Sequence, residues 1–209
     1  MNLIIVQIQL DLLSNFLDRV TAEAGQELDS IEDRRLAGDF PSFGDYEQAI
    51  DFPLARIQIA ARAVAYELVA LVEGELHQLA REPWLASSAH KGPKNIQQLS
   101  RINPETLTKL RMVSDLPFDE VVALIVDRFG IALADLEGWS AIRELRDAVN
   151  AFKHRRGFKH PRDINWWSKD GTFGQRYAIN HDEAAKAIGD VASFFRALKN
   201  SLERRTGHQ

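Results

Sequence analysis

The sequence has 209 residues, of which 45% are hydrophobic and 27% charged, and a formal net charge of −4 at pH 7. This length fits one large domain, because domains usually hold about 100 to 200 residues. The composition is that of a globular chain rather than a disordered or collagen-like one. The sequence contains no cysteine, which excludes disulfides, thiolate zinc sites, iron–sulfur clusters and cysteine nucleophiles.

The charges are distributed unevenly along the chain. Residues 1–85 carry 15 acidic and 6 basic side chains, whereas residues 86–209 carry 15 acidic and 20 basic ones. A basic second half indicates a local anionic partner or the association of unlike surfaces. No basic residue precedes the apolar run at residues 3–6, and polar residues follow it closely. A signal peptide begins with basic residues, and a membrane span needs a much longer apolar run. We therefore expect a cytoplasmic protein with no membrane segment.

The first half of the chain predicts two long helices joined by a connector. Apolar residues recur every three or four positions over residues 3–33 and again over 51–81, the spacing of amphipathic helices. Pro53 suits the first turn of the second helix, and turn formers place the connector at 36–46. Such a pair is expected to form an antiparallel hairpin. The apolar stripe of the first helix exceeds what one partner helix covers, so we also expect a symmetric homodimer.

The second half of the chain predicts three further helices, at residues 117–129, 141–155 and 182–204. Asp115 is the expected cap of the first of these helices, and Gly130 its stop. Asn180 and Glu183 have the spacing of a capping box at the start of the last one.

The remaining segments are rich in turn formers. Residues 86–104 predict either a surface loop or a functional lid, and residues 165–179 predict a small β-hairpin. Outside that hairpin the sequence has no extended run of alternating polarity. The predicted fold is all-α, a single domain over residues 1–209 in which four or five helices form a bundle.

One predicted helix carries the residues best suited to chemistry. At 100° per residue, one face of it displays four polar side chains within about 60° of each other: Arg143, Asp147, Asn150 and His154. Arg146 lies at the border with the apolar face. Histidine transfers protons near neutral pH, and arginine binds phosphate, so this set suits RNA cleavage without a metal.

These residues receive distinct candidate roles. His154 is the candidate general acid and base, with Arg143 or Arg146 as the phosphate ligand. Asn150 would orient the reacting groups, and Asp147 would tune His154. The alternative is an ordinary solvated helix face whose cations complement the helix dipole.

A basic run extends through and beyond the end of the same helix. No acidic residue interrupts its members, which are candidates for binding an RNA backbone: Lys153, Arg155, Arg156, Lys159, His160 and Arg162. Trp166 is a candidate for stacking on a base, although Trp166 and Trp167 more often close a small satellite core. The histidines lack metal-ligand spacing and nucleotide-binding loops are missing, so we expect no cofactor or metal.

A second polar line lies on the second predicted helix. Glu67, Glu73 and Glu75 compose it together with Arg62. It either faces the helix at 141–155 or is solvated. We expect the solvated arrangement, because glutamate is rarely buried.

A family resemblance rests on the order of these elements and on one motif. The long hairpin is followed by a helix with an Arg-polar pair at Arg146-Asp147, then Asn150, and then Lys153-His154-Arg155 before a glycine. The last helix opens with Tyr177-Ala-Ile-Asn-His-Asp-Glu. This arrangement resembles the HEPN superfamily of α-helical proteins, whose signature places four to six residues between the arginine and the histidine. Here seven residues separate Arg146 from His154.

The resemblance implies one compact HEPN-like domain, commonly dimeric. It implies a metal-independent endoribonuclease or an RNA-binding protein of a toxin–antitoxin or defence system, with a protein partner such as an antitoxin. Many members of the superfamily are non-catalytic. The alternative is therefore a non-catalytic helical interaction or dimerisation protein.

Overall fold

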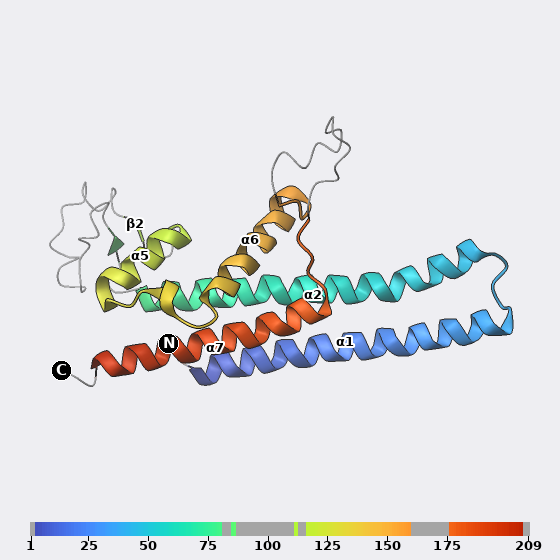
Figure 1. Ribbon diagram of the computed structural model, residues 1–209, viewed down its shortest axis with the longest axis horizontal. Coiled ribbons are helices and arrows are strands. Elements are labelled where there is room, and N and C mark those ends of the chain that lie inside the picture. Colours follow the sequence, from blue (N-terminus) through green and yellow to red (C-terminus); the bar gives the residue numbers. More distant parts are fainter. Residues whose placement is uncertain (1–2, 81–84, 87–110, 113–115, 160–175, 207–209) are drawn as a thin grey trace, which may run out of the picture.

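The computed structural model describes residues 3–80, 85–86, 111–112, 116–159 and 176–206. Two long helices, α1 (Leu3–Ala37) and α2 (Phe43–Ala80), run antiparallel and set the length of the molecule (Figure 1). The sequence predicted this pair, and the antiparallel hairpin is confirmed.

The shorter helices pack on one half of the hairpin. α7 (His181–Thr206) lies beside α1 and α2, and α5 (Phe118–Phe129) and α6 (Trp139–Arg155) contact α2 (Figure 1). A 3-10 helix at Leu133–Asp135 connects α5 to α6. The predicted all-α bundle is thus confirmed for the described residues. None of these described helices combines the length and apolar character needed to cross a membrane.

The hairpin forms because each helix buries one apolar stripe. The side chains that α1 buries recur at helical spacing: Val6, Leu10, Leu17, Ala24 and Ile31. The facing stretch of α2 is rich in small residues and is almost fully covered: Ala60, Ala61, Val64, Ala65 and Leu68. Since alanine occupies little space, the helices can approach closely along this stretch.

The second helix begins at Phe43, so the prediction that it starts near residue 51 is wrong. Ser42 caps it, since its Oγ accepts a hydrogen bond from the backbone N–H of Asp45 at 3.2 Å. Such a bond satisfies one of the amides that the first helical turn leaves without a partner. The connector is therefore confined to residues 38–42, shorter than the predicted 36–46.

Pro53 lies inside α2 and is buried, rather than in the first turn as predicted. A proline removes one backbone hydrogen bond from a helix interior. Contacts with α1 on both sides of Pro53 hold α2 through it: Tyr46 hydrogen-bonds Glu32, and Arg56 pairs with Glu27. Tertiary packing thus outweighs the local preference of the residue.

Glu32 of α1 links the two long helices at the connecting end of the hairpin. Arg35 Nη2 lies 2.5 Å from Glu32 Oε1, and the Tyr46 hydroxyl donates to Glu32 Oε2 at 3.2 Å. The Arg35 guanidinium holds the pKa of the Glu32 carboxyl below its usual range, and Glu32 raises the pKa of Arg35. This end extends well beyond α7 (Figure 1).

Local capping signals set the ends of the shorter helices. Gly130 ends α5 in the left-handed region at φ 62°, as predicted, with its N–H bonded to the Val126 carbonyl at 2.8 Å. The N-cap of α5 is Pro117, and Asp115 lies outside the described residues.

The capping box before α7 is also confirmed. The Glu183 amide donates to Asn180 Oδ1 at 3.0 Å, and the Asn180 amide donates to Glu183 Oε2 at 2.9 Å. Two backbone donors at the start of α7 thereby gain partners, which fixes where this helix begins.

An aromatic cluster joins α5, α6 and α7. The Trp139 ring lies 5.9 Å from the Phe118 ring and 5.5 Å from the Phe194 ring, and Phe195 stands 5.4 Å from Phe194. All four side chains are buried. Offset aromatic contacts of this kind add about 0.5–1.5 kcal/mol each beyond the burial of area.

A two-residue strand pair departs from the prediction. β1 (Leu85–Ala86) pairs antiparallel with β2 (Arg111–Met112), with Leu85 opposite Met112. The sequence predicted no sheet outside residues 165–179. Pairs this short escape sequence analysis, because two residues carry no alternation to detect.

Two other predicted segments fall mainly outside the described residues. Residues 87–104 of the predicted loop are not among them, nor are residues 165–175 of the predicted β-hairpin. In the described remainder of the hairpin range, Arg176 forms an isolated antiparallel bridge with Phe158. The predicted hairpin is therefore not shown.

Gly138 provides a test of how closely α6 and α7 pack. It has φ +81°, and a Cβ there would lie 2.3 Å from the Asp190 carbonyl oxygen. Because both strain and steric overlap result, we predict that Gly138→Ala lowers the free energy of unfolding by about 2–4 kcal/mol. Urea denaturation followed by circular dichroism measures this loss.

Gly189→Ala is the matched control. A Cβ at Gly189, within α7, would meet nothing within 4 Å, so this change is expected to stabilise the chain by up to about 1 kcal/mol. Equal effects of the two substitutions would contradict the close approach at Gly138.

Candidate nucleic-acid interface

The end of α6 positions the predicted basic residues. Arg156 and Gly157 adopt left-handed conformations, with φ 51° and 85°, and the Gly157 amide donates to the Ala151 carbonyl at 3.0 Å. The Arg156 amide donates to the same carbonyl, and this second bond is the 6→1 bond of a Schellman ending. A Cβ on Gly157 would lie 2.8 Å from the Phe152 ring. The chain therefore turns sharply after α6, and Phe158 is buried.

The polar face predicted on this helix is present, but its members have different surroundings. Arg143 Nη1 lies 2.5 Å from Asp119 Oδ1 on α5. Asp147 and His154 are exposed, and Asn150 is half-buried. Among the described residues, no hydrogen bond or ion pair to the His154 imidazole is present. His154 thus faces solvent at the end of the helix.

Arg146 is held between α6, α2 and α5. Its Nε lies 2.8 Å from Glu73 Oε1, and its guanidinium carbon lies 4.4 Å from the centre of the Phe118 ring. Its side chain is only 23% exposed. A helix rises about 1.5 Å per residue, which separates Arg146 from His154 by about 12 Å along the axis and Arg143 by about 16 Å. Within one chain the structure does not bring either arginine to His154.

The prediction that the polar line of α2 is solvated is confirmed for Glu67 and is wrong for Glu73. Glu73 faces α6 through Arg146, and the Arg62 guanidinium stands 5.7 Å from the Phe152 ring of α6. Glu67 is exposed, and Glu75 turns toward α1, where it lines a groove. The line divides because α6 crosses α2 at an angle and covers only part of it.

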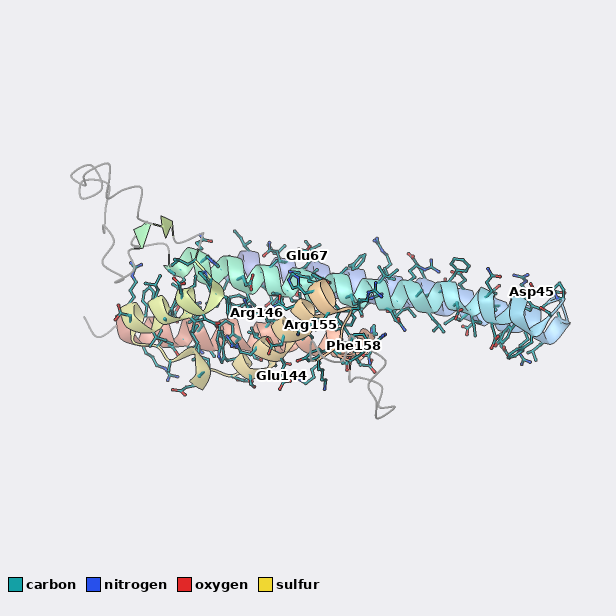
Figure 2. The ribbon with its side chains drawn as sticks, turned by 90° about the horizontal axis from the view of Figure 1, so that it is seen from above. Asp45, Glu67, Glu144, Arg146, Arg155 and Phe158 are labelled. Atoms are coloured by element: carbon teal, nitrogen blue, oxygen red, sulfur yellow. The ribbon has the colours of Figure 1, made fainter. Side chains whose placement is uncertain are left out.

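The basic residues beyond Arg146 gather around the end of α6, and we call this group the α6-end cluster. Its members are Lys153, His154, Arg155, Arg156, Lys159 and Arg176. Figure 2 shows Arg155 and Phe158 near the end of α6, with Arg146 nearer its middle. No carboxylate ion pair engages a member of the cluster within the described part of the chain. Several cations at a helix C-terminus also complement the helix dipole.

Neighbouring groups orient some of these cations. Arg155 Nε donates to the Phe158 carbonyl at 3.1 Å, and the Arg176 guanidinium stands 4.2 Å from the Phe158 ring. Lys153 lies 5.2 Å from the Tyr66 ring. Such contacts fix the orientation of a charged side chain and leave some of its N–H groups able to donate hydrogen bonds to a ligand.

Arg176 is a member that sequence reasoning missed. It follows Phe158 by many residues in the chain, and only the bridge between the two brings it to α6. The sequence around Arg176 contains no pattern that would indicate its position beside α6. Three predicted binding residues, His160, Arg162 and Trp166, lie outside the described residues.

The chain matches no protein-family model, no curated protein and no solved structure. The described residues contain no group of three or more histidine and carboxylate side chains arranged to hold a metal ion. Functional inference therefore rests on the geometry of the chain itself.

The surroundings of Arg146 predict a structural role that can be measured. Arg146→Ala removes a half-buried ion pair and a stack on Phe118, so we expect the free energy of unfolding to fall by about 1–2 kcal/mol. Arg143→Ala removes a more exposed pair and is expected to cost at most about 0.5 kcal/mol. Chemical denaturation of both variants makes the comparison. Equal losses would show that Arg146 does not tie α6 to α2.

Proposed function

We propose that this chain is an HEPN-like RNA-binding protein of the cytoplasm and that the α6-end cluster binds the RNA backbone. The supporting observation is the set of basic side chains, most of them exposed, that lack carboxylate partners among the described residues. RNA carries one negative charge per nucleotide, and neutralising it releases counterions, which drives binding. Arginine forks also match the geometry of phosphate oxygens.

Metal-independent cleavage is the second part of the proposal. His154 is the general acid and base, placed beside the cations that hold the phosphate. Arg143 and Arg146 would each have to leave a carboxylate partner to reach that phosphate. Arg155 and Arg156 adjoin His154 in the sequence, which favours them as the groups that stabilise charge on the phosphate.

A helical interaction protein is the second candidate function. α7 begins near Asp18, where His181 Nε2 lies 3.9 Å from Asp18 Oδ1, so the hairpin beyond this point lacks cover from α7 (Figure 1). That part exposes several large apolar side chains: Leu36, Phe43, Phe52, Leu54 and Ile59. Exposed apolar groups of this kind favour a protein partner, as a toxin–antitoxin or defence role would require.

RNA binding is tested by reversing charges in the α6-end cluster. The double variant Arg156→Glu/Lys159→Glu is expected to weaken binding of a fluorescent single-stranded RNA at least about tenfold. The slope of log Kd against log salt concentration should also fall by about 2, because each phosphate contact contributes about 1 to this slope. Fluorescence anisotropy over a salt series measures both quantities.

The matched control places the same charge change on α7. Arg196→Glu/Lys199→Glu alters net charge equally but lies outside the α6-end cluster, so we expect its Kd to stay within about twofold of the original. If both double variants weaken binding alike, binding depends on overall charge, and the α6-end assignment is wrong.

Cleavage is tested with His154→Ala in the presence of EDTA. Removing a general acid or base lowers a rate by about 100- to 10,000-fold, and products of a metal-free route should end in a 2′,3′-cyclic phosphate. His181→Ala, at the start of α7, should leave cleavage intact.

The results separate the two candidate functions. Wild-type protein that binds RNA but cleaves none of it would remove the nuclease part and leave the binding part. Protein that does neither would favour the interaction protein.

A further inference from the structure

One exposed face of α1 carries a row of large apolar side chains, which we call the α1 ridge. Its members recur at intervals of three and four residues, which places them on one side of the helix: Ile5, Ile8, Leu12 and Phe16. Their exposed fractions are 51%, 53%, 62% and 38%. Other residues of α1 bury the opposite stripe against α2 and α7, so the ridge is additional to what folding of one chain uses.

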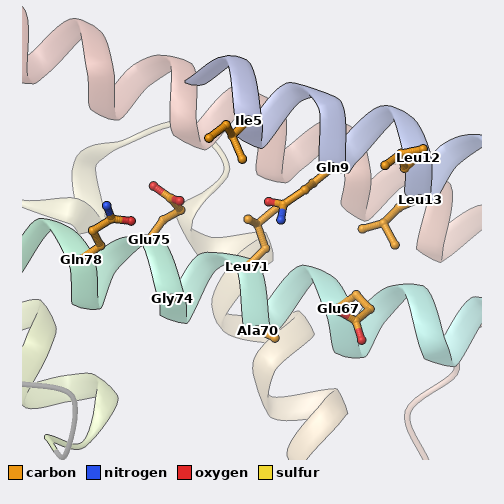
Figure 3. Close-up of a pocket in the computed structure, with 10 residues that line it drawn as sticks. All are labelled: Ile5, Gln9, Leu12, Leu13, Glu67, Ala70, Leu71, Gly74, Glu75 and Gln78. Atoms are coloured by element: carbon orange, nitrogen blue, oxygen red, sulfur yellow. The ribbon is translucent and has the colours of Figure 1, made fainter. Parts of the chain in front are cut away.

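A groove runs beside this ridge between α1 and α2. It has a volume of about 590 Å³, with Ile5, Gln9 and Leu12 on the α1 side. The α2 side includes Ala70 and Gly74 (Figure 3). The absence of a large side chain at Ala70 and at Gly74 leaves room there for side chains from outside.

Nothing in the fold of a single chain requires a glycine at position 74, which is Gly74 of α2. It lies in the interior of α2, where glycine lowers helix stability relative to alanine. Its φ is not positive, and a Cβ built there meets nothing within 4 Å. Neither the backbone nor intrachain packing therefore requires glycine at this position, whereas a second helix lying across the groove would benefit from it.

Glu75 adds a polar indication at the same place. Its Oε2 atom is buried and has no hydrogen-bond partner within the described residues, and the side chain lines the groove. A buried oxygen without a donor is unfavourable. An incoming surface that carries an amide, such as Gln9 or Gln78 of a second copy, would supply one.

The exposed area fits an interface between proteins. With roughly 180–220 Å² for each fully exposed large side chain, the ridge offers about 400 Å², the size of the largest apolar patch on a typical monomer, which is often functional. A stable interface buries about 800 Å² on each partner. The ridge supplies about half of that area, and the groove with the flanking residues of α1 and α2 has to supply the rest.

We propose that this face joins two copies of the chain around a two-fold axis, with the α1 ridge of each copy in the groove of the other. A symmetric contact requires one surface to carry both the projecting and the receiving part. Here the ridge and the groove adjoin on the same pair of helices, which favours a second copy over an unrelated partner. The proposal is independent of RNA binding, because none of the α6-end cluster lines the groove.

The test measures oligomeric state for the full chain. Light scattering coupled to size exclusion, at about 50 μM, should give twice the monomer mass of 23.6 kDa. Gly74→Leu fills the groove and should raise the dimer Kd at least tenfold. Since leucine favours helix more than glycine, the melting temperature of the monomer should not fall, which separates loss of association from loss of folding.

Two control variants locate the interface. Gly25→Leu replaces a glycine of α1 that also has open space around it and does not line the groove, and it should leave the dimer intact. Leu36→Glu changes an apolar side chain that is 71% exposed near the far end of the hairpin, and it should also leave the dimer intact, whereas Leu12→Glu should abolish it.

Three outcomes would overturn the proposal. A monomeric wild-type chain at this concentration would do so. So would a dimer that survives both Gly74→Leu and Leu12→Glu, because the groove would then not be the contact. A dimer lost on Leu36→Glu but kept on Leu12→Glu would place the interface at the far end of the hairpin instead.

Discussion

The burial of α2 is the constraint on which the rest of the structure depends. This helix contacts α1, α5, α6 and α7, and the buried side chains that it contributes are small where the helices lie closest. Ala61 and Ala65 are fully buried. The apolar surface of α2 is removed from water only when several neighbouring helices pack on it together. Each shorter helix is therefore positioned relative to α2, and the direction of α6 decides which of its residues reach solvent.

Arg146 shows how that direction decides the chemistry available to α6. On an isolated helix it would stand at the border between the polar and apolar faces. The crossing of α6 over α2 instead brings Glu73 to 2.8 Å and the Phe118 ring to 4.4 Å. A guanidinium with a carboxylate partner offers less to a phosphate, because the anion must compete for it. The basic residues around Arg156 have no carboxylate partner among the described residues, which moves the candidate interface to the end of the helix.

The unequal lengths of the helices leave the hairpin incompletely covered. α7 reaches α1 only as far as Asp18, while α1 continues to Ala37. The far end around Phe43 and Phe52 is exposed because α7 stops short of it. The α1 ridge lies in the half of the hairpin that α7 reaches, on a face of α1 that neither α2 nor α7 covers. The two exposed apolar surfaces therefore have different causes.

The sequence by itself determined the helices of this protein and most of their ends. Their signals are local, since an apolar period of 3.6 residues, the stop at Gly130 and the capping box at Asn180 each involve residues close together in the chain. Only the tertiary structure decided that α2 continues through Pro53, that Glu73 neutralises Arg146, and that Arg176 joins the basic cluster. These outcomes depend on contacts between residues far apart in sequence. The free energy of such contacts outweighs local conformational preferences, and no local sequence pattern reveals it.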